Sequence, residues 1–401
     1  MTRMPRTDFG RLWMAQSVSA LGSRVTRTAL PVLAILSVDG TPLELGILAA
    51  VSTGPGAIVA LLAAGRIDRA QKRSVLIGAD LVRAVLILTL PLAAWLGALT
   101  MLQLYGVAAL VGTASALFAV TDNAYLVHLV PAEELVDKNA KLETTESIAE
   151  IVGPGFAGLL IEWVTAPMAM LLDAISYVWS AVLLFRIQTR EPELPTTTPH
   201  LWTDLREGFD AVWSEPRVRP YLIVTAIQTL ADSFFFALYM LFTLETLALS
   251  VGAVGVIISM GGFGALFGAL LSRRITSRGG LIAAFTVSQL SMIFIPLAAV
   301  GGWWAIGLLV AHQLVSDGFE IAYQVHATTH RQTYLDRSVL ARANGIFTAV
   351  ETLLLPVAAL GAGAVAEAIG IGNALYLGVT FALVSPLPLL ALPKWVASRS
   401  Q

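Results

Sequence analysis

Long apolar segments, separated by short polar or glycine- and proline-containing breaks, run along almost the whole chain. A helix needs roughly 20 mostly apolar residues to cross the hydrocarbon core of a bilayer. Segments of about this length occur twelve times, at 12–38, 43–65, 74–96, 102–127, 140–163, 167–187, 218–246, 251–272, 279–300, 303–328, 340–367 and 372–393. The pattern therefore predicts an all-α membrane protein with twelve transmembrane helices.

Basic residues collect in alternate breaks. The breaks without lysine or arginine lie near 39–42, 97–101, 164–166, 247–250, 301–302 and 368–371. The other breaks, the span ends that border them and the two termini hold 22 of the 25 basic residues, and the remaining three, Arg24, Arg27 and Arg83, lie deeper within predicted spans. Because loops rich in lysine and arginine stay in the cytoplasm, we expect both termini on the cytoplasmic side of the cell (inner) membrane.

Composition agrees with a membrane protein and excludes several other classes. Charged residues make up 13% of the chain, against about 25% in a typical soluble domain. There is no cysteine, and five histidines give little support to a metal site. The chain has no P-loop pattern and no nucleophile–base constellation, so we expect neither an enzyme nor a bound cofactor. A net charge of −2 gives no basic field for nucleic acid.

Matching residues recur 205 positions apart in the two halves of the chain. The four pairs are Asn139 and Asn344, Glu146 and Glu351, Gly158 and Gly363, and Glu162 and Glu367. Four pairs in one register indicate two related halves of like orientation, as in transporters with parallel repeats. We expect one six-helix bundle at 1–187 and another at 218–401. The segment between them, 188–217, is polar and then amphipathic, which predicts a linker helix on the cytoplasmic surface.

Six plus six helices, a long central loop and a basic loop between the second and third helices resemble the major facilitator superfamily. The loop at 64–73, AGRIDRAQKR, is similar to the family signature G-x-L-x-D-R-x-x-R-R, with Ala64 in place of the first glycine. Its counterpart at 268–273, GALLSR, keeps the glycine and lacks the acid. The resemblance implies the major facilitator fold, which consists of two pseudo-symmetric six-helix bundles.

Shorter segments resemble the macrolide-efflux and enterobactin-exporter-like branch of this superfamily. They lie at 78–84, 129–135 and 206–209, and GPGFAG at 153–158 is similar to the G-P-x-x-G-G segment of drug-exporting antiporters. The resemblance implies export of an amphipathic small molecule such as a drug, a macrolide or a siderophore-like compound. The branch often has an acid after the Leu-Gly of the first helix, whereas residues 21–24 here are LGSR.

Ionisable side chains within predicted spans are candidates for proton coupling, because charges in a membrane are costly and usually face the bundle interior. In the N-terminal half these candidates are Arg24, Arg27, Asp122, Glu146 and Glu150. The two arginines lie near the midplane and need an acidic neighbour, for which Asp122 and Glu150 are the candidates. The arginines either contact an anion or a titrating carboxylate, or form a structural ion pair.

Glutamates of the predicted fifth helix share one face. Glu143, Glu146 and Glu150 follow helical spacing, so their mutual repulsion favours proton uptake by at least one of them. Glu351, in the eleventh helix, is the repeat partner of Glu146. The alternative is that Glu143 is interfacial, and that Glu146 and Glu351 bond to neighbouring backbone or arginine.

Deep acids and aromatic residues also occur in the seventh and tenth helices, which by the family resemblance line the central cavity together with the first and fourth. The acids are Asp232, Asp317 and Glu320. The aromatic residues are Phe235, Phe236, Tyr239 and Tyr323. They would give an apolar wall for an amphipathic ligand, and helix or lipid packing is the alternative for each.

Two further groups are expected to serve conformational change. By resemblance, the loop between the second and third helices latches the two halves, and the expected cytoplasmic gate is Asp68, Arg69 and Arg73 with Asp80 and Arg83. The expected bend in the fifth helix is at Gly153, Pro154 and Gly158, since proline removes a backbone hydrogen bond and glycine permits close packing. A static kink is the alternative.

These features predict a secondary transporter that works by alternating access and exports an amphipathic small molecule, with proton antiport as its drive. Deep acids outnumber deep arginines, which favours a cationic substrate or protons. We expect a monomer whose partners are a small-molecule substrate, protons and the bilayer. The alternatives are a proton-coupled uptake symporter, and a non-transporting sensor or lipid-handling protein with the same fold.

Overall fold

The computed structural model describes residues 6–67, 70–189, 191 and 201–393. Within these residues the secondary structure is helical without strands, and twelve helices are long and apolar enough to cross a membrane. Each of them overlaps one of the segments predicted from the apolar pattern, so the predicted fold class is confirmed. Asp68 and Arg69, two of the expected gate residues, lie outside the described residues.

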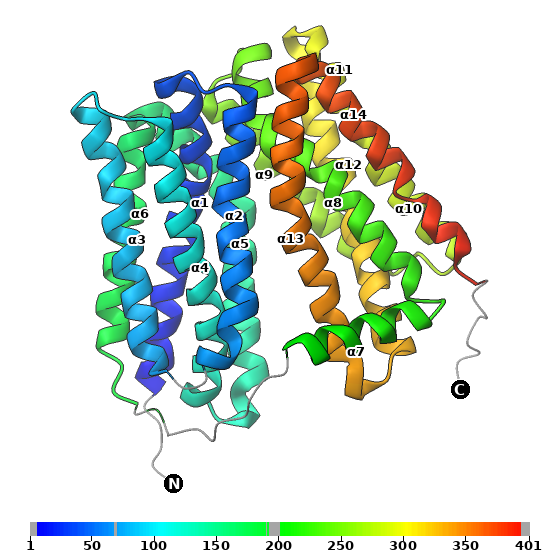
Figure 1. Cartoon of the computed structure of the whole chain (residues 1–401), viewed down its shortest axis with the longest axis horizontal. Coiled ribbons are helices and arrows are strands. Elements are labelled where there is room, and N and C mark those ends of the chain that lie inside the picture. Colours follow the sequence, from blue (N-terminus) through cyan, green and yellow to red (C-terminus); the bar gives the residue numbers. More distant parts are fainter. Residues whose placement is uncertain (1–5, 68–69, 190, 192–200, 394–401) are drawn as a thin grey trace. The chain divides into compact units, whose positions relative to one another are not determined.

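The chain folds into two compact units. Unit 1 takes the described residues of Met1–Pro199 together with Ala248–Ser259. Its helices, coloured blue to green in Figure 1, are α1 (Arg6–Val38), α2 (Pro42–Ile67), α3 (Lys72–Trp95), α4 (Met101–Leu129), α5 (Leu135–Val164) and α6 (Ala166–Phe185). In this unit α1 packs against α5 and α6, α2 packs against α4, and α3 packs against α4 and α6.

Unit 2 takes the described residues of His200–Leu247 and Met260–Gln401. Its helices are α7 (Leu201–Ser214), α8 (Arg219–Leu241), the second part of α9 (Val251–Ser272), α10 (Arg278–Ser291), α11 (Phe294–Leu297), α12 (Gly302–Tyr334), α13 (Arg337–Ile369) and α14 (Ile371–Val384). Here α8 packs against α13 and α14, and α10 packs against α12 and α14. These are the same pairings that α1 and α3 make in unit 1.

The two units also bury equivalent residues in one register. Three core pairs lie 205 residues apart, and every member is at most 3% exposed: Leu76 and Leu281, Leu184 and Leu389, and Ile187 and Leu392. The register extends to a polar contact. Arg73 donates to the carbonyl of Phe185, and Arg278 donates to the carbonyl of Leu390. The spacing seen in the sequence therefore recurs in the packing of each unit.

Two predicted spans are interrupted by proline. In the ninth span, α10 ends at Ser291 and α11 follows, because Pro296 has no N–H to offer the carbonyl of Met292. In the twelfth span, α14 ends at Val384 and a 3₁₀ turn covers Leu387–Ala391. Pro386 likewise cannot bond to the carbonyl of Ala382, and the Ser385 hydroxyl donates to that oxygen instead at 2.7 Å. The breaks are therefore local and leave both segments long enough to span.

The amphipathic part of the segment 188–217 is helix α7. Its Gly208 lies so close to α13 that a Cβ there would come within 2.5 Å of the carbonyl oxygen of Arg342. The Arg342 side chain pairs with Asp204 at 3.0 Å and with Glu207 at 2.6 Å. Val212 completes the contact from within the core of unit 2. Helix α7 is therefore docked on α13 of its own unit through Gly208, Val212 and its acidic residues, while Phe209 and Trp213 are 43% and 46% exposed.

Candidate functional site

Arg24 on α1 forms an ion-pair cluster with two glutamates of α5. It is 5% exposed, and it pairs with Glu146 and, at 2.7 Å, with Glu150. The side chains of Glu146 and Glu150 are 53% and 63% exposed, so these ion pairs lie at the edge of the contact between α1 and α5. Gly153 makes the contact possible, because a Cβ there would come within 2.5 Å of the Arg24 side-chain stem. The acid expected beside Arg24 is therefore Glu150, joined by Glu146.

Asp122 has a different partner and lines a cavity. The amide of Gln16 on α1 donates to Asp122 on α4 at 2.5 Å. A cavity of about 440 Å³ opens beside this pair, between α1, α4 and α5. Three carboxylates line it, those of Asp122, Glu143 and Glu146, and the lining includes no lysine or arginine. The remaining lining is mostly amide, hydroxyl and small apolar groups. We call this cavity pocket A.

Unit 2 has a cavity of about 410 Å³ at the equivalent place, between α8, α12 and α13, which we call pocket B. Much of its lining lies 205 residues beyond the lining of pocket A: Gln16 and Tyr221, Ala20 and Thr225, Asp122 and Ala327, Asn123 and Thr328, Leu126 and Arg331, Asn139 and Asn344, Leu142 and Phe347, Glu143 and Thr348, and Glu146 and Glu351. The repeat thus keeps the position of the cavity and changes its chemistry.

The charge of the two pockets differs at three of these positions. Pocket B replaces Asp122 by Ala327 and Glu143 by Thr348. It gains Arg331, whose guanidinium lies 4.4 Å from the ring centroid of Phe347. Pocket A is lined by three acidic residues and no basic one, whereas pocket B is lined by one acidic and one basic residue. A cation is therefore favoured in pocket A by its lining.

The predicted acids of unit 2 have different immediate contacts. Glu320 accepts a hydrogen bond from Gln324 at 2.9 Å, and Asp317 lies against Gly261 of α9, where a Cβ would overlap its carboxylate. Glu351 lines pocket B, and Asp232 is partly buried on α8. Arg27, in unit 1, is exposed one turn beyond Arg24. Glu320, Glu351 and Asp317 nevertheless lie near enough to Asp232 to repel its carboxylate, although only Glu351 lines pocket B.

Of the four predicted cavity aromatics, Tyr323 alone is among the residues that line pocket B. Its ring stacks on Phe285 with centroids 4.2 Å apart. Phe235 is buried against Gly378 of α14, and Phe236 is 48% exposed. The Tyr239 hydroxyl is buried without a hydrogen-bond partner among the described residues. Helix packing accounts for the position of Phe235, whereas Tyr323 lies both in the core of unit 2 and in the lining of pocket B.

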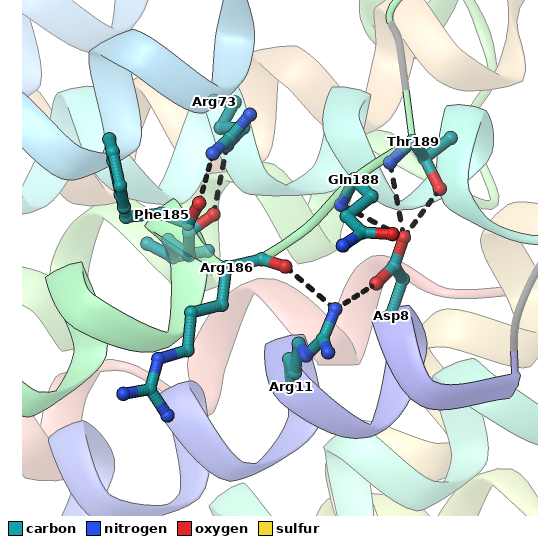
Figure 2. Close-up of polar contacts among 8 residues, drawn as sticks. Asp8, Arg11, Arg73, Phe185, Arg186, Gln188 and Thr189 are labelled. Atoms are coloured by element: carbon teal, nitrogen blue, oxygen red, sulfur yellow. Dashed lines mark hydrogen bonds and ion pairs between the residues drawn. The ribbon is translucent and has the colours of Figure 1, made fainter.

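The expected gate residue Arg73 lies against the end of α6. Its Nε donates to the carbonyl of Leu184 at 2.9 Å and its guanidinium also bonds to the carbonyl of Phe185 (Figure 2). The final carbonyls of a helix have no partner within the helix, so a guanidinium there satisfies them and complements the helix dipole. Glu191 then accepts from the backbone N–H groups of Lys72 and Arg73, both at 2.7 Å, and caps α3.

A second set of contacts holds the segment that follows α6. Asp8 on α1 accepts from the N–H groups of Gln188 and Thr189 at 3.1 Å, and from the Thr189 hydroxyl at 2.8 Å. Arg11 pairs with Asp8 at 2.7 Å and donates to the carbonyl of Arg186 at 2.6 Å (Figure 2). The exit of α6 is therefore fixed to α1 and α3. The other gate candidates, Asp80 and Arg83, are buried between α3 and α6 instead.

The predicted bend residues of α5 serve close helix packing. α5 is one helix from Leu135 to Val164, with Pro154 inside it. Gly158 approaches the first part of α9, where a Cβ would come within 2.6 Å of the Val251 carbonyl oxygen. The N–H of Gly155 donates to the Ser259 hydroxyl at 2.8 Å. Small residues let two membrane helices approach closely, so these glycines hold α9 against α5 within unit 1.

The described residues form twelve membrane-length helices in two repeated units, with an equivalent cavity in each. Comparison of the sequence with known protein families gives a result that agrees with this architecture. The family model described as the Major Facilitator Superfamily matches residues 12–353. The chain belongs to this superfamily. The family recognised from the sequence is thereby confirmed, and the protein is a multi-pass membrane transporter whose partners include a small-molecule substrate and the lipid bilayer.

Several relatives of this transporter are similar over most of their length. The uncharacterized MFS-type transporter y4rN of Sinorhizobium fredii is 27% identical over 367 residues, which cover 88% of this chain and 87% of that protein. The multidrug efflux pump Tap of Mycobacterium tuberculosis is 26% identical over 389 residues, which cover 92% of this chain and 89% of that protein. Tap of Mycolicibacterium fortuitum is 26% identical over 309 residues, covering 74% and 75%.

Solved structures of transporters share the fold. The nucleoside transporter NupG superposes with a TM-score of 0.77 at 13% identity, covering 97% of this chain and all of that one (100%). A bacterial homologue of the iron transporter ferroportin, in an inward-facing state, gives a TM-score of 0.77 at 15% identity, covering 98% and 99%. At these identities the structures support the fold alone.

Two pocket residues of this transporter were missed by reasoning from sequence. Gln16 is uncharged and does not stand out in an apolar helix, and Arg331 falls in a predicted basic loop, yet each lines a pocket. The 205-residue register could have identified Arg331. It is the repeat equivalent of Leu126, and it lies one helical turn beyond Ala327, which is the repeat equivalent of Asp122. Only packing reveals that Gln16 is the residue that orients Asp122.

Proposed function

We propose that this transporter exports a cationic amphipathic small molecule in exchange for protons, by alternating access of its two six-helix halves. One observation carries the proposal: pocket A has three carboxylates, Asp122, Glu143 and Glu146, and no basic residue in its lining. A cation that leaves water needs compensating negative charge, and a largely apolar ligand needs a concave surface to cover it.

The contrast between the pockets supports selectivity for positive charge. The equivalent cavity in unit 2 has the same location in its repeat and yet carries Arg331 and only one carboxylate. An acidic lining is therefore not required to build a cavity in this fold. Pocket B instead offers aromatic rings from Tyr221, Tyr323 and Phe347, which suit the apolar part of an amphipathic ligand.

Asp122 is the residue we assign to the charge of the substrate. Glu146 already pairs with Arg24, and Glu143 is exposed. Asp122 is partly buried, and the Gln16 amide occupies only one of its two oxygens in the described contacts. The Gln16 amide is an uncharged donor, so it leaves the charge of the Asp122 carboxylate to be balanced by a cationic ligand or a proton. Protons and the cationic substrate would then compete for the acids of the transporter.

We base export, as the direction of transport, on two similarities to other proteins. The relatives that carry a functional name are called multidrug efflux pumps. The GPGFAG segment of α5 is similar to that of drug-exporting antiporters, and its glycines make close contacts within unit 1. The distribution of basic residues puts both termini in the cytoplasm. We propose a monomer in the cell membrane, with Arg73 part of a cytoplasmic gate.

Transport by the purified protein in proteoliposomes, with an imposed pH gradient, tests the proposal. The probe is tetraphenylphosphonium, a permanently charged apolar cation, and triphenylphosphine oxide is its uncharged control. We expect the cation to move opposite to protons. For one proton per cation the exchange moves no net charge, so a gradient of one pH unit supports about tenfold accumulation. Movement of the cation in the same direction as protons would refute antiport. No movement of any cation would favour a sensor with this fold.

A further inference from the structure

Three charged side chains meet inside unit 1, away from pocket A, where α3 and α6 pack together. Asp80 and Arg83 come from α3 and Asp173 comes from α6, and they are 0%, 4% and 0% exposed. Arg83 pairs with Asp80. Its guanidinium also lies 4.5 Å from the ring centroid of Phe118 and 4.1 Å from that of Tyr177. We call Asp80, Arg83 and Asp173 the α3–α6 cluster.

The cluster contains one cation and two carboxyl groups. Asp173 makes no ion pair with any described residue, and the hydrogen bond it receives comes from the Ser176 hydroxyl at 3.1 Å. A carboxylate that is sealed from water without a cation is strongly disfavoured. Neutralising Asp173 with a proton removes this cost and leaves the Arg83–Asp80 pair complete.

Several polar atoms of the cluster have unused bonding capacity. One carboxyl oxygen each of Asp80 and Asp173, and the Nε of Arg83, are buried without a hydrogen-bond partner among the described residues. The Thr26 hydroxyl lies near Asp173 and the Ser180 hydroxyl near Asp80, and neither closes a hydrogen bond of normal geometry. Buried polar groups are rarely left unbonded. The Asp173 carboxyl oxygen that has no hydrogen-bond partner is therefore the atom best placed to bind a proton.

The surroundings of Asp173 add no other compensating charge. The charged groups acting on it are Arg83 and Asp80, both from α3. Its neighbour on α1 is Gly22, where a Cβ would come within 2.6 Å of a carboxylate oxygen, with Thr26 one turn further on. Its own helix presents Ser176 and Tyr177, and α4 presents the uncharged Phe118 to Arg83.

The second unit fills the same space with other groups. They include a carboxylate, because the Ser288 hydroxyl donates to Glu320 at 3.4 Å, and Glu320 is the equivalent of Ser115, which Arg83 contacts in unit 1. The positions 205 residues beyond Asp80, Arg83 and Asp173 hold Phe285, Ser288 and Gly378. Phe285 is 0% exposed and stacks on Tyr323, the equivalent of Phe118, and the Phe234 side chain fills the space beside Gly378. The six-helix unit is therefore built here without the arginine and without the two aspartates. Since the fold does not require this arrangement of one arginine and two aspartates, the cluster of unit 1 points to a function.

We propose that the α3–α6 cluster is a proton-binding site, with Asp173 as the proton acceptor and Arg83 as the group that responds. When a proton from water bonds to the free Asp173 oxygen, Arg83 pairs with Asp80 alone, as in the structure. When Asp173 returns that proton to water, its carboxylate recruits the unused Nε–H of Arg83. The guanidinium then bridges α3 and α6 more tightly.

The site is linked to pocket A through α1. Asp173 packs on Gly22, and the same helix carries Gln16, which holds Asp122, and Arg24, which pairs with α5. A change in the charge of Asp173 alters the packing of α1 on α6. Because α1 also lines pocket A, the same change alters the shape of pocket A. The coupling part of this inference rests on the proposed antiport, whereas proton binding itself does not.

Infrared spectroscopy of the purified full-length protein in lipid tests proton binding. A protonated carboxylic acid has a C=O stretch that a carboxylate lacks. Other buried carboxyl groups can contribute to this region, so the band of interest is the one in the difference spectrum of the wild type minus Asp173→Asn. We expect this Asp173 band to be present in the wild type at neutral pH and absent from Asp173→Asn. The control Asp39→Asn makes the same substitution at an exposed position whose positive φ of 51° asparagine tolerates. It should keep the band.

Asp80→Asn provides a second, independent variant. It frees Arg83 to pair with Asp173, so the proton should leave and the band should disappear, although Asp173 is still present. If Asp173→Asn does not fold, Asp80→Asn still tests whether Asp173 binds a proton. Retention of the band in either folded variant would overturn the proposal. Loss of the band on adding sodium at constant pH would show a metal-cation site and would also overturn it.

Transport separates this inference from the proposed function. In proteoliposomes with a gradient of one pH unit, Asp173→Asn should carry tetraphenylphosphonium only down its own gradient. Accumulation should therefore fall from about tenfold to none. Persistent accumulation would refute coupling through this site. If the wild-type protein moves no cation at all, the proposed function fails, while the infrared band still reports whether Asp173 holds a proton.

Discussion

Replacing Asp122 by asparagine removes one charge from pocket A and keeps the shape of the side chain. The carbonyl oxygen of the introduced amide can still accept the hydrogen bond that Gln16 donates at 2.5 Å, so the contact between α1 and α4 is retained. The residue lies in a cavity lining and not in a tightly packed core. We therefore expect the thermal midpoint of the purified variant to stay within about 2 °C of the wild type.

The expected loss of affinity follows from the Coulomb interaction. Two unit charges 4 Å apart interact by about 1 kcal/mol in water and about 4 kcal/mol at the effective dielectric constant typical near a protein surface. Asp122 is partly buried beside an open cavity, which puts it between these limits. A loss of about 2 kcal/mol corresponds to roughly 30-fold weaker binding of a monovalent cation. Binding of an uncharged ligand should change by less than about threefold.

Calorimetric titration of the detergent-solubilised protein measures both ligands, tetraphenylphosphonium and triphenylphosphine oxide. The Asp39→Asn variant controls for a change in net charge far from the pocket. A selective loss for the cation is the expected result. Equal affinity of the wild type and the folded Asp122→Asn variant for the cation would contradict the assignment of Asp122. An equal loss for both ligands would indicate that the substitution damaged the cavity.

The other predictions concern contacts that hold the helices together. Gly112→Ala puts a Cβ in steric overlap with the Ser52 carbonyl oxygen, so we expect it to destabilise by about 1–3 kcal/mol in chemical unfolding. Gly106→Ala on the same helix meets nothing within 4 Å and should be neutral or stabilising; equal effects would refute the α2–α4 contact. Arg24→Lys should be milder than Arg24→Met in thermal unfolding, because lysine keeps the charge and loses the bidentate contact. Arg73→Met should expose the end of α6 to limited proteolysis, and unchanged cleavage there would contradict its capping role.

The apolar pattern was sufficient to predict the helices, because a membrane leaves few ways to satisfy the backbone. Every hydrogen-bonding group in the hydrocarbon region must be paired within the segment, so a long apolar run becomes a helix. The breaks at Pro296 and Pro386 were the exceptions, and their cause is local. The 205-residue register was also visible in the sequence, since equivalent positions in two related bundles meet equivalent environments.

The partners of the buried charges were only partly predictable. Glu150 was one of the two acids predicted to lie beside Arg24, and the structure pairs them. The prediction was possible because a buried arginine needs an acidic neighbour to balance its charge. Asp122, the other candidate, pairs with Gln16, because the rotation of α1 turns Gln16 and Arg24 toward different helices. Asp80 and Arg83 were assigned to a gate by their place near a loop. Their burial against α6 favours a role inside the unit.

The sequence by itself therefore determined the membrane class, the twelve helices, the repeat and the family, all of which follow from patterns along one chain. Only the tertiary structure decided which charges meet. It put Asp122 in an acidic pocket and its repeat partner Ala327 in a mixed one, and it sealed Asp173 beside an arginine that already has a partner. The reason is physical: helix formation in a bilayer depends on local apolarity, whereas the chemistry of a site depends on how helices distant in sequence rotate toward one another.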